Sequence, residues 1–561
     1  MHPALAVPEL VQEIFTHIED RDGLDAFTTL IEKNRAFARL ARTCKAFKRP
    51  AIEELWADAA VYHLVNSLIP HRLVMRRHGD PDPYGWSTTF RQTKTWIADV
   101  EPLTPRDIDV IREYSSCIRT LRFPSLFTIP IAGPVLRALA SLPGGVERTF
   151  PKLRSVVVTD WLDGVILQDY LPFVTHASFL DLEFSEQGLT NAGIDFLSKF
   201  TSRHGPAVYG LDLSFASVLT KPASRELLPK LCLNILRLDH LRTLVCTDLD
   251  QPTLLHVSRL PNLVSLNFKN ILDLSTTPIL SFPALESLTT KLYDFSAVLF
   301  FLRKLSRFPS SIQVPSWDTT TISDSEALFS ILASRRDTKL RSITQAHQGG
   351  GFQNAHEFLT LRTIQPLLVF TSLTVFEWYS PSGVLITDAD LGLIAHTWPH
   401  LERLRLISKT HNYIPVATLD GVFTMAKLCP RLQSLTLPVD ASKLSGIAPD
   451  DPADGLCHRR LQWLNMGTCC INAKDQAKLA FILAQGFPHL DSVGLDVQDP
   501  ENIGGSRTVV GVHIGRALKY LRCAKEEGII KSWAEDESRI REMLVRFFGQ
   551  ACRVDSDLTH T

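Results

Sequence analysis

Few residue groups in the chain have the types and spacing that chemistry requires. The nearest candidates are one glycine cluster and two pairs of metal-ligand residue types. They are Gly349-Gly350-Gly351 flanked by His347 and His356, Cys457-His458, and Cys469-Cys470. The glycine cluster lacks the lysine and the helix start of a phosphate-binding loop. Structural zinc sites use spaced pairs such as CxxC, and adjacent residues of a strand point to opposite faces. We therefore expect a loop and core cysteines, with no metal and no cofactor.

The remaining composition argues against several function classes. The strings GxxxxGK[ST], GxGxxG, HExxH and GxSxG are absent, which predicts that the chain is not an enzyme. Lys and Arg number 59 against 60 Asp and Glu, so the positive surplus of a nucleic-acid-binding protein is missing. The first residues lack a secretory pattern, and no apolar run approaches the ~20 residues of a membrane span. Ten scattered cysteines are typical of a reducing compartment, so we expect an intracellular protein, cytoplasmic or nuclear or both.

A repeated string organises the middle of the chain. The string of an apolar residue, Pro, any residue, Leu, any two residues and a second apolar residue recurs well above the roughly one match that chance predicts, and six copies mark predicted repeats. The six strings begin at Phe150, Leu260, Phe282, Trp398, Cys429 and Phe487. Weaker copies begin near Ile118, Ala177, Val208, Leu241, Pro309, Leu340, Leu373 and Leu461. The mean spacing of about 29 residues lies at the top of the range for leucine-rich repeats.

Each repeat is expected to contain one strand and one helix. The proline stops the helix, and the following Leu-x-x-Leu-x-Leu forms a short strand with its leucines inward. Helix starts are indicated by Thr387-Asp388, by Asp324-Ser325 before residues 327–332, and by Asn472 before residues 473–484. A single strand and helix cannot bury their apolar faces, whereas stacked neighbours can. We therefore predict an α/β fold: a curved, irregular solenoid with parallel strands on the concave side and helices on the convex side.

The residues that alternate with the buried leucines are expected on the concave surface. In the later repeats they are Glu377, Tyr379, Arg403, Arg405, Trp463 and Asn465. Trp, Tyr and Arg dominate the binding energy of many protein interfaces. We predict that Tyr379, Arg403, Arg405 and Trp463 form part of a target-binding surface. The alternative is that Trp463 packs on a neighbouring repeat while the arginines are only solvated.

The N-terminal residues predict three short amphipathic helices. The first carries Val7-Pro8-Glu9-Leu10 and Ile14-Phe15, and the second carries residues 37–47 with Arg39, Arg42, Lys45 and Lys48 on its wet side. Pro50 is expected to open the third, which carries Ile52, Leu55 and Trp56. So small a set of helices is marginal as an independent domain. It could serve as a cap for the first repeat or as a module that docks a partner.

These helices resemble an F-box. The resemblance rests on Val7-Pro8-Glu9-Leu10 with Ile14-Phe15, on Leu40-Ala41-Arg42-Thr43-Cys44-Lys45-Ala46-Phe47, and on Pro50-Ala51 with Leu55-Trp56. The usual opening Leu-Pro is Val-Pro here, and the segment from Glu19 to Asn34 is longer than the common spacer. The array that follows is similar to the leucine-rich domains of many fungal F-box proteins.

The resemblance implies a function without bond chemistry. An F-box protein is the substrate-recognition subunit of a Skp–cullin–F-box ubiquitin ligase: its helices dock a Skp-type adaptor and its repeats hold a target protein. Matched by motif, the adaptor-binding candidates are Pro8, Glu9, Leu10, Ile14, Phe15, Cys44, Phe47, Leu55 and Trp56. Some of these side chains must instead hold the helices together. The alternative is a repeat scaffold whose N-terminal helices only cap it.

The predicted organisation has four parts. Residues 1–65 form the F-box-like module, 66–116 a helical or loop connector, 117–498 the leucine-rich-repeat solenoid and 499–561 a C-terminal helical cap or tail. Residues 512–527 and 533–548 are amphipathic, with Ile514, Leu518 and Leu521 on the first and Trp533, Ile540 and Leu544 on the second. They are expected to cover the open edge of the last repeat, or to bind a second partner. We expect neither nucleic acid nor membrane among the partners.

Overall fold

A computed structural model gives the placement of most of the chain. The described residues are 26–77, 95–123, 133–159, 172–174, 177, 179–183, 191–205, 208–213, 227–271, 277–292, 294–316, 320–335, 339–347, 358–380, 383–408, 413–442, 444, 446–453, 455–469, 475–497, 510–542 and 544. They divide into two compact units, which we describe separately: unit 1 is Met1–Leu285 and unit 2 is Glu286–Thr561. In the described part of the chain, no helix is both long enough and apolar enough to cross a bilayer.

Unit 1 alternates strands and helices after an N-terminal helix pair. Its helices are α2 (Ala26–Thr43), α3 (Lys45–Ala57), α4 (Val61–Leu68), η2 (Pro70–Arg72), α5 (Pro105–Ser115), α6 (Gly133–Ala140), α7 (Gly145–Thr149), α9 (Asn191–His204), α11 (Leu228–Ile235) and α12 (Gln251–Arg259). Its parallel strands follow the order β1 (Asp58–Ala60), β4 (Thr120–Phe123), β5 (Ser155–Thr159), β6 (Phe179–Glu183), β7 (Gly210–Leu213), β8 (Thr243–Leu249) and β9 (Ser265–Ile271).

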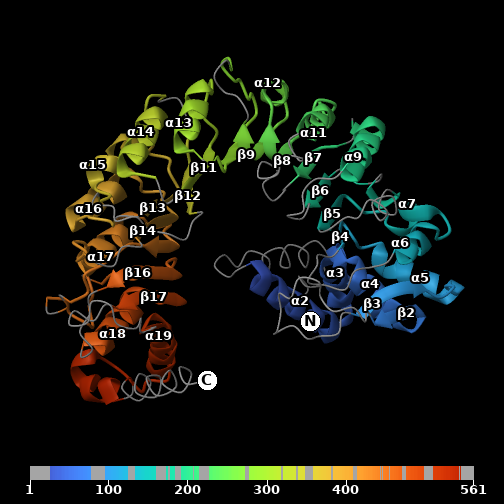
Figure 1. The fold of residues 1–561 in the computed structure, drawn as a ribbon. Coiled ribbons are helices and arrows are strands. Elements are labelled where there is room, and N and C mark those ends of the chain that lie inside the picture. The colour runs from blue at the N-terminus through green and yellow to red at the C-terminus, as the bar shows by residue number, and fades with distance from the viewer. Residues whose placement is uncertain are drawn as a thin grey trace. The chain divides into compact units, whose positions relative to one another are not determined.

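Unit 2 continues the same alternation. Its helices are α13 (Phe295–Lys304), α14 (Ile322–Ala333), α15 (Leu361–Ile364), η5 (Gln365–Val369), α16 (Asp388–Thr397), α17 (Leu419–Leu428), α18 (Gln476–Gly486) and α19 (Val510–Glu526). Its strands follow the order β10 (Ser287–Thr290), β11 (Ser311–Ser316), β12 (Ser342–His347), β13 (Val375–Ser380), β14 (Arg403–Ser408), β15 (Ser434–Thr436), β16 (Trp463–Cys469) and β17 (Ser492–Val497). Figure 1 shows helices α13 to α18 along one face of these strands. The prediction of a parallel α/β repeat fold is therefore confirmed within each unit.

The predicted repeat starts locate the strands. Every strand from β4 to β17 begins two residues after the leucine of a proline string or after the start of a weaker copy: β4 follows Ile118, β14 follows Leu401 and β16 follows Leu461. The proline strings end helices as expected, because α16 stops at Thr397 directly before Trp398-Pro399. The leucine of the string is buried, and its amide donates to the carbonyl of the apolar residue before the proline, as Leu401 does to Trp398 at 3.1 Å.

The observed helix starts agree to different degrees with those predicted from the sequence. Thr387 caps α16 with a reciprocal pair of hydrogen bonds to Asp390, as predicted. Helix α14 begins at Ile322, because Thr321 caps it with the same bonds to Asp324, a few residues earlier than expected. Asn472 lies outside the described residues, and α18 begins at Gln476.

The N-terminal boundaries differ from the prediction. Cys44 has an extended backbone and separates α2 from α3, so Pro50 lies inside α3 and does not open a third helix. An interior proline lacks the amide of one helical hydrogen bond and costs about 3 kcal/mol, so the rest of α3 must offset this cost. Within residues 1–65, strand β1 already pairs in parallel with β4. The connector at 66–116 contains an antiparallel pair, β2 (Leu73–Arg77) and β3 (Thr95–Val100), besides α5.

The C-terminal helices pack on the last repeat. Arg522 of α19 donates to the carbonyl of Leu490, directly before β17. Residues 533–542 are helical, and the Asp450 carboxylate accepts from the amides of Trp533 and Ala534 at their start. The Trp533 ring lies 5.4 Å from that of Phe481 on α18. These contacts agree with a cap over the end of unit 2.

Candidate functional site

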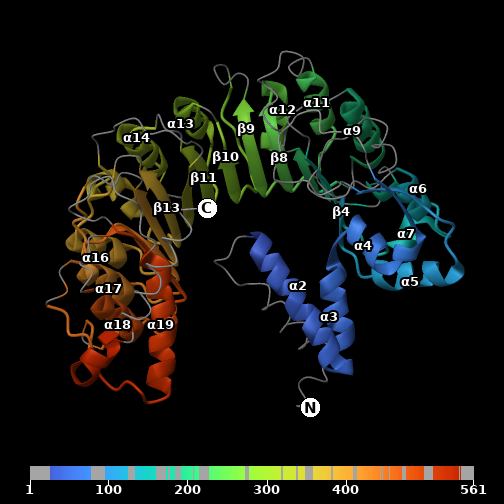
Figure 2. The same ribbon diagram turned by 60° about the horizontal axis from the view of Figure 1, so that its bottom comes forward.

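Helices α2 and α3, which we call the helix pair, lie side by side in unit 1 (Figure 2). Among the side chains that the structure describes, Phe37 and Ala51 are fully buried between them and form a two-residue core. The apolar side chains that pack against this core are only partly buried: Leu40, Ala41, Phe47 and Leu55.

The predicted adaptor-binding residues have different environments in the structure. Pro8, Glu9, Leu10, Ile14 and Phe15 lie outside the described residues. Phe47 and Leu55 belong to the core of the helix pair, so part of each side chain holds the two helices together. The Trp56 ring lies 5.3 Å from the Tyr114 ring of α5, which ties it to unit 1. Cys44, at the junction of α2 and α3, is half-buried with a free thiol.

Ion pairs connect the end of α3 to the sheet of unit 1. Arg122 of β4 donates to both carboxylate oxygens of Asp58, from Nε at 2.7 Å and from Nη2 at 2.8 Å. Arg119 Nη2 lies 3.3 Å from the buried carboxylate of Glu54. A bidentate arginine pair fixes direction as well as distance. The helix pair is therefore joined to the first strands by specific contacts.

The register of unit 2 brings the predicted target-binding residues onto one face. From β13 to β16 one row contains Val375, Arg403, Ser434 and Trp463, and the next contains Glu377, Arg405, Thr436 and Asn465. Residues between these rows, such as Leu404 and Leu435, are buried, so the rows lie on the opposite face of the sheet. We call Glu377, Arg403, Arg405, Thr436 and Trp463 the arginine face.

A single carboxylate serves both arginines. Glu377 Oε1 lies 3.4 Å from Arg403 Nη1 and 3.9 Å from Arg405 Nη1. The side chains are 43% and 38% exposed for the two arginines and 20% exposed for the glutamate. The register neighbours on β12 and β15, which include Ser342, Thr344 and Ser434, are uncharged. The three ionised groups therefore carry one net positive charge.

Tyr379 corrects the predicted surface. Alternation along β13 predicts its side chain on the open face, but it is only 7% exposed. It lies near the end of the strand, where its amide donates to the side-chain Oε1 of the buried Gln345 at 3.0 Å. Strand alternation weakens where a strand gives way to its loop, and so the tyrosine is covered. Trp463 is half-buried, which leaves part of its ring accessible beside Arg403's row.

Two polar atoms of the arginine face have no hydrogen-bond partner among the described residues. They are Arg405 Nε and Thr436 Oγ1, and Thr436 is 4% exposed. Sequence reasoning missed Thr436, although it occupies in Leu435-Thr436-Leu437 the place that Arg405 occupies in Leu404-Arg405-Leu406. It also named Glu377 without its pairing, which depends on the parallel register of β13 and β14.

Asn465 comes next after Thr436 in the row of Glu377 and Arg405, and its side chain lies toward β17. Its amide lies over Gly494 of β17: an added Cβ at Gly494 would lie 2.7 Å from the Asn465 Cγ. The Asn465 Oδ1 also accepts from the Gly467 amide at 2.8 Å. Gly467 has φ of 52°, a conformation that favours glycine. The asparagine is thus held toward β17 and away from Thr436.

Of the cysteine and histidine candidates, His458 is part of the core, whereas Cys457 is exposed. His458 is buried, its Nδ1 accepts from the Leu461 amide at 3.1 Å, and its Nε2 lies 3.2 Å from the Cys429 carbonyl oxygen. Burial lowers the pKa of His458 below 6.5 and raises the pKa of the Cys429 thiol to about 12. The glycine cluster, His356 and Cys470 lie outside the described residues. In the described part of the chain, no three His, Cys, Asp or Glu residues are placed to hold a metal ion.

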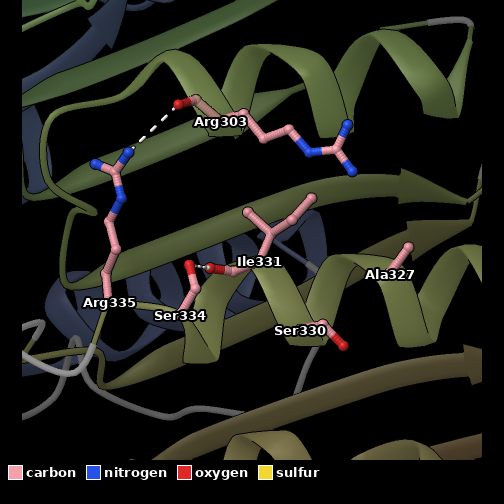
Figure 3. A pocket seen from close by; sticks show the side chains of 6 residues that line it. All are labelled: Arg303, Ala327, Ser330, Ile331, Ser334 and Arg335. Atoms are coloured by element: carbon pink, nitrogen blue, oxygen red, sulfur yellow. Dashed lines mark hydrogen bonds between the residues drawn. The ribbon is translucent and has the colours of Figure 1, made fainter.

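A pocket of about 360 Å³ lies between α13 and α14 on the helical side of unit 2. Arg335 points across it toward α13 and donates to the carbonyl of Arg303 at 3.3 Å, while the Arg303 guanidinium points away (Figure 3). Ser334 donates to the Ile331 carbonyl at 2.6 Å. The polar groups of this pocket are therefore engaged with backbone carbonyls, and it offers less to a ligand than the arginine face.

Comparison with known proteins does not assign the chain to a family. No protein-family model matches it, and no curated protein matches it.

Proposed function

We propose that the chain is a non-catalytic substrate-recognition subunit of a Skp–cullin–F-box type ubiquitin ligase. In this proposal the F-box-like helices dock a Skp-type adaptor, and the parallel array is a leucine-rich-repeat domain whose strand face holds a target protein. The observation that carries the proposal is the helix pair, with its two-residue core and its partly exposed apolar side chains.

Energetics favour a partner for the helix pair. Fully burying a side chain of the size of Leu or Phe contributes about 1.5–3 kcal/mol. Leu40, Phe47 and Leu55 realise only part of this contribution within the pair. A docked adaptor would complete the burial of these side chains.

The alternative function also has a specific observation in its favour. Helix α3 leads directly into β1, and the Arg122–Asp58 and Arg119–Glu54 pairs fix that junction to the first strands. These contacts suit a helical cap of a scaffold protein that recruits no ligase. A cap stabilises the array, whereas an adaptor module binds a second chain, so the two functions predict different losses.

Co-purification of the full chain with a Skp-type adaptor separates them. The variants are Phe47→Ser, in the helix pair, and Leu10→Ser, in the F-box motif. Each should weaken adaptor capture by tenfold or more, about 1.4 kcal/mol, and leave thermal unfolding of the array nearly unchanged. Leu233→Ser on α11, which removes an exposed leucine (57% accessible), is the matched control and should capture the adaptor normally.

A cap predicts the opposite pattern. In that case Phe47→Ser lowers the unfolding temperature of the array, and neither the parent chain nor the control captures the adaptor. Failure of the parent chain to capture any Skp-type adaptor overturns the ligase proposal.

A further inference from the structure

Two guanidinium groups of the arginine face share a carboxylate that satisfies neither of them fully. The Glu377 contacts of 3.4 and 3.9 Å are longer than the 2.7–2.9 Å that is typical of charge-assisted hydrogen bonds. Both arginine side chains retain more than a third of their exposure. An exposed ion pair of this kind contributes little to stability, about 0–1 kcal/mol. Fold stability alone therefore does not account for this ion pair.

The unpartnered donors lie in the same row of the sheet. Arg405 Nε and Thr436 Oγ1 are register neighbours across β14 and β15, and neither has a hydrogen-bond partner among the described residues. A buried donor without a partner costs about 1–3 kcal/mol. Asn465, the next residue in the row, is held over Gly494 and does not supply the acceptor. An acceptor from outside would recover this cost.

The charge balance indicates which acceptor suits the face. Two guanidinium groups and one carboxylate leave a single positive charge, which one further carboxylate neutralises. The half-buried Trp463 stands in the row of Arg403, two strands away across the small Ser434. With strands ~4.8 Å apart, the indole lies roughly 10 Å from Arg403 along the sheet. Side chains on the same face of an extended peptide lie two residues and about 6.6 Å apart, and the lengths of an acidic and an apolar side chain cover the remaining distance.

We propose that the arginine face binds an acidic segment of a partner protein, with a carboxylate on Arg403 and Arg405 and an adjacent apolar side chain against Trp463. The inference deepens the proposed function, since it names the chemical class of the target. The incoming carboxylate displaces Glu377 from the guanidinium groups, so Glu377 acts as a built-in competitor that lowers the affinity of this face for any incoming carboxylate.

Fluorescence anisotropy with the full chain tests the proposal without any adaptor. The probes are two dye-labelled twelve-residue peptides of alternating Glu and Ser around a central Phe, one of them with every Glu replaced by Gln. The chain should bind the acidic peptide at least tenfold more tightly than the Gln peptide. Arg405→Gln and Arg403→Gln should each remove about tenfold of that affinity. Arg431→Gln, which alters an exposed arginine in the turn before β15, is the matched control and should change nothing.

The decisive variant is Glu377→Gln. It keeps the size of the side chain and removes the competing charge, so affinity for the acidic peptide should rise several-fold. A glutamate that only stabilises the sheet predicts no gain. If Arg405→Gln fails to fold, as judged by circular dichroism, Arg403→Gln and Glu377→Gln still decide the question.

Three results would overturn the proposal. The first is equal affinity for the acidic and the Gln peptide, and the second is unchanged affinity in the Arg403, Arg405 and Glu377 variants. The third is equally tight binding of a twelve-nucleotide single-stranded DNA, which would indicate a general polyanion site. None of these results bears on adaptor capture by the helix pair, so the inference and the proposed function fail separately.

Discussion

The helix pair and the arginine face differ in almost every physical respect. The helix pair has an apolar surface, built around Phe37 and Ala51, with its neighbours only partly buried. The arginine face has a polar surface on a sheet whose opposite side is a continuous core, and its side chains are positioned by the register of four strands. Binding at the helix pair would draw its free energy from burial of apolar surface, whereas binding at the arginine face would draw it from the placement of charges.

This difference predicts how each surface recognises a partner. Apolar burial is non-directional and roughly proportional to area, so the helix pair suits a permanent partner of matching shape. Charged groups on a rigid sheet contribute more to specificity and to the rate of association. A protein that must join one constant subunit and discriminate among targets needs both kinds of surface.

Phe37→Ala should have the largest effect. A buried phenylalanine replaced by alanine costs about 3–5 kcal/mol, which a two-residue core cannot absorb. Hydrogen exchange should increase in α2 and α3, and adaptor capture should be lost. Acidic-peptide binding should remain, because the arginine face lies in unit 2.

Arg39→Ala is the control for that prediction, since Arg39 is an exposed residue of the same helix. It should leave hydrogen exchange and peptide binding as in the parent chain. Loss of peptide binding in Phe37→Ala would contradict the view that the two surfaces are independent.

Salt concentration should affect binding at the two surfaces differently, with a smaller effect than that of Phe37→Ala. The Debye length falls from about 10 Å at 0.1 M to about 3 Å at 1 M salt, which screens exposed charges. Raising sodium chloride across that range should weaken acidic-peptide binding several-fold and leave adaptor capture unchanged or slightly stronger. Glu377→Gln should show a steeper salt dependence than the parent chain, because its face carries one more net charge. Equal salt dependence of the two interactions would contradict the comparison.

The repeat array was predictable from the sequence because its signals are local. A proline that ends a helix, a leucine that is buried four residues after the helix end, and a strand that begins two residues later all lie within one short segment. Trp398-Pro399-His400-Leu401 before Arg403 contains all three. The cap at Thr387 is local in the same sense.

The features that escaped prediction depend on contacts between distant segments. Strand β1 forms because Asp58 and its neighbours pair with β4, more than 50 residues later. Tyr379 is buried against the alternation of its strand, and its amide is bound by Gln345 of the preceding strand, 34 residues earlier. The pairing of Glu377 with two arginines of β14, and the place of Thr436 beside Arg405, require the register. The residue types of the arginine face were thus predictable, whereas their mutual contacts were not.

The two units should also respond to pH with opposite signs, which is the smallest expected effect. Burial lowers the pKa of His458 in unit 2, so the unfolded chain binds more protons near its ordinary pKa of 6.5. The stability of unit 2 should therefore fall as pH decreases through that value. In unit 1, burial raises the pKa of the Asp248 carboxyl above 3.8, so stability should fall as pH rises through the higher folded value.

Hydrogen exchange measured in steps from pH 7 to pH 4 distinguishes these slopes within one chain, once the intrinsic pH dependence of exchange is subtracted. In His458→Asn the protection of β16 should depend less on pH than in the parent, because the amide oxygen can accept from the Leu461 amide without titrating. In Asp248→Asn the protection of β8 should rise at pH 7, because a neutral amide replaces a carboxylate whose ionised form burial disfavours. Each variant serves as the control for the other unit. The same sign of response in both units would mean that these two buried groups do not govern it, and that surface charge common to both units does.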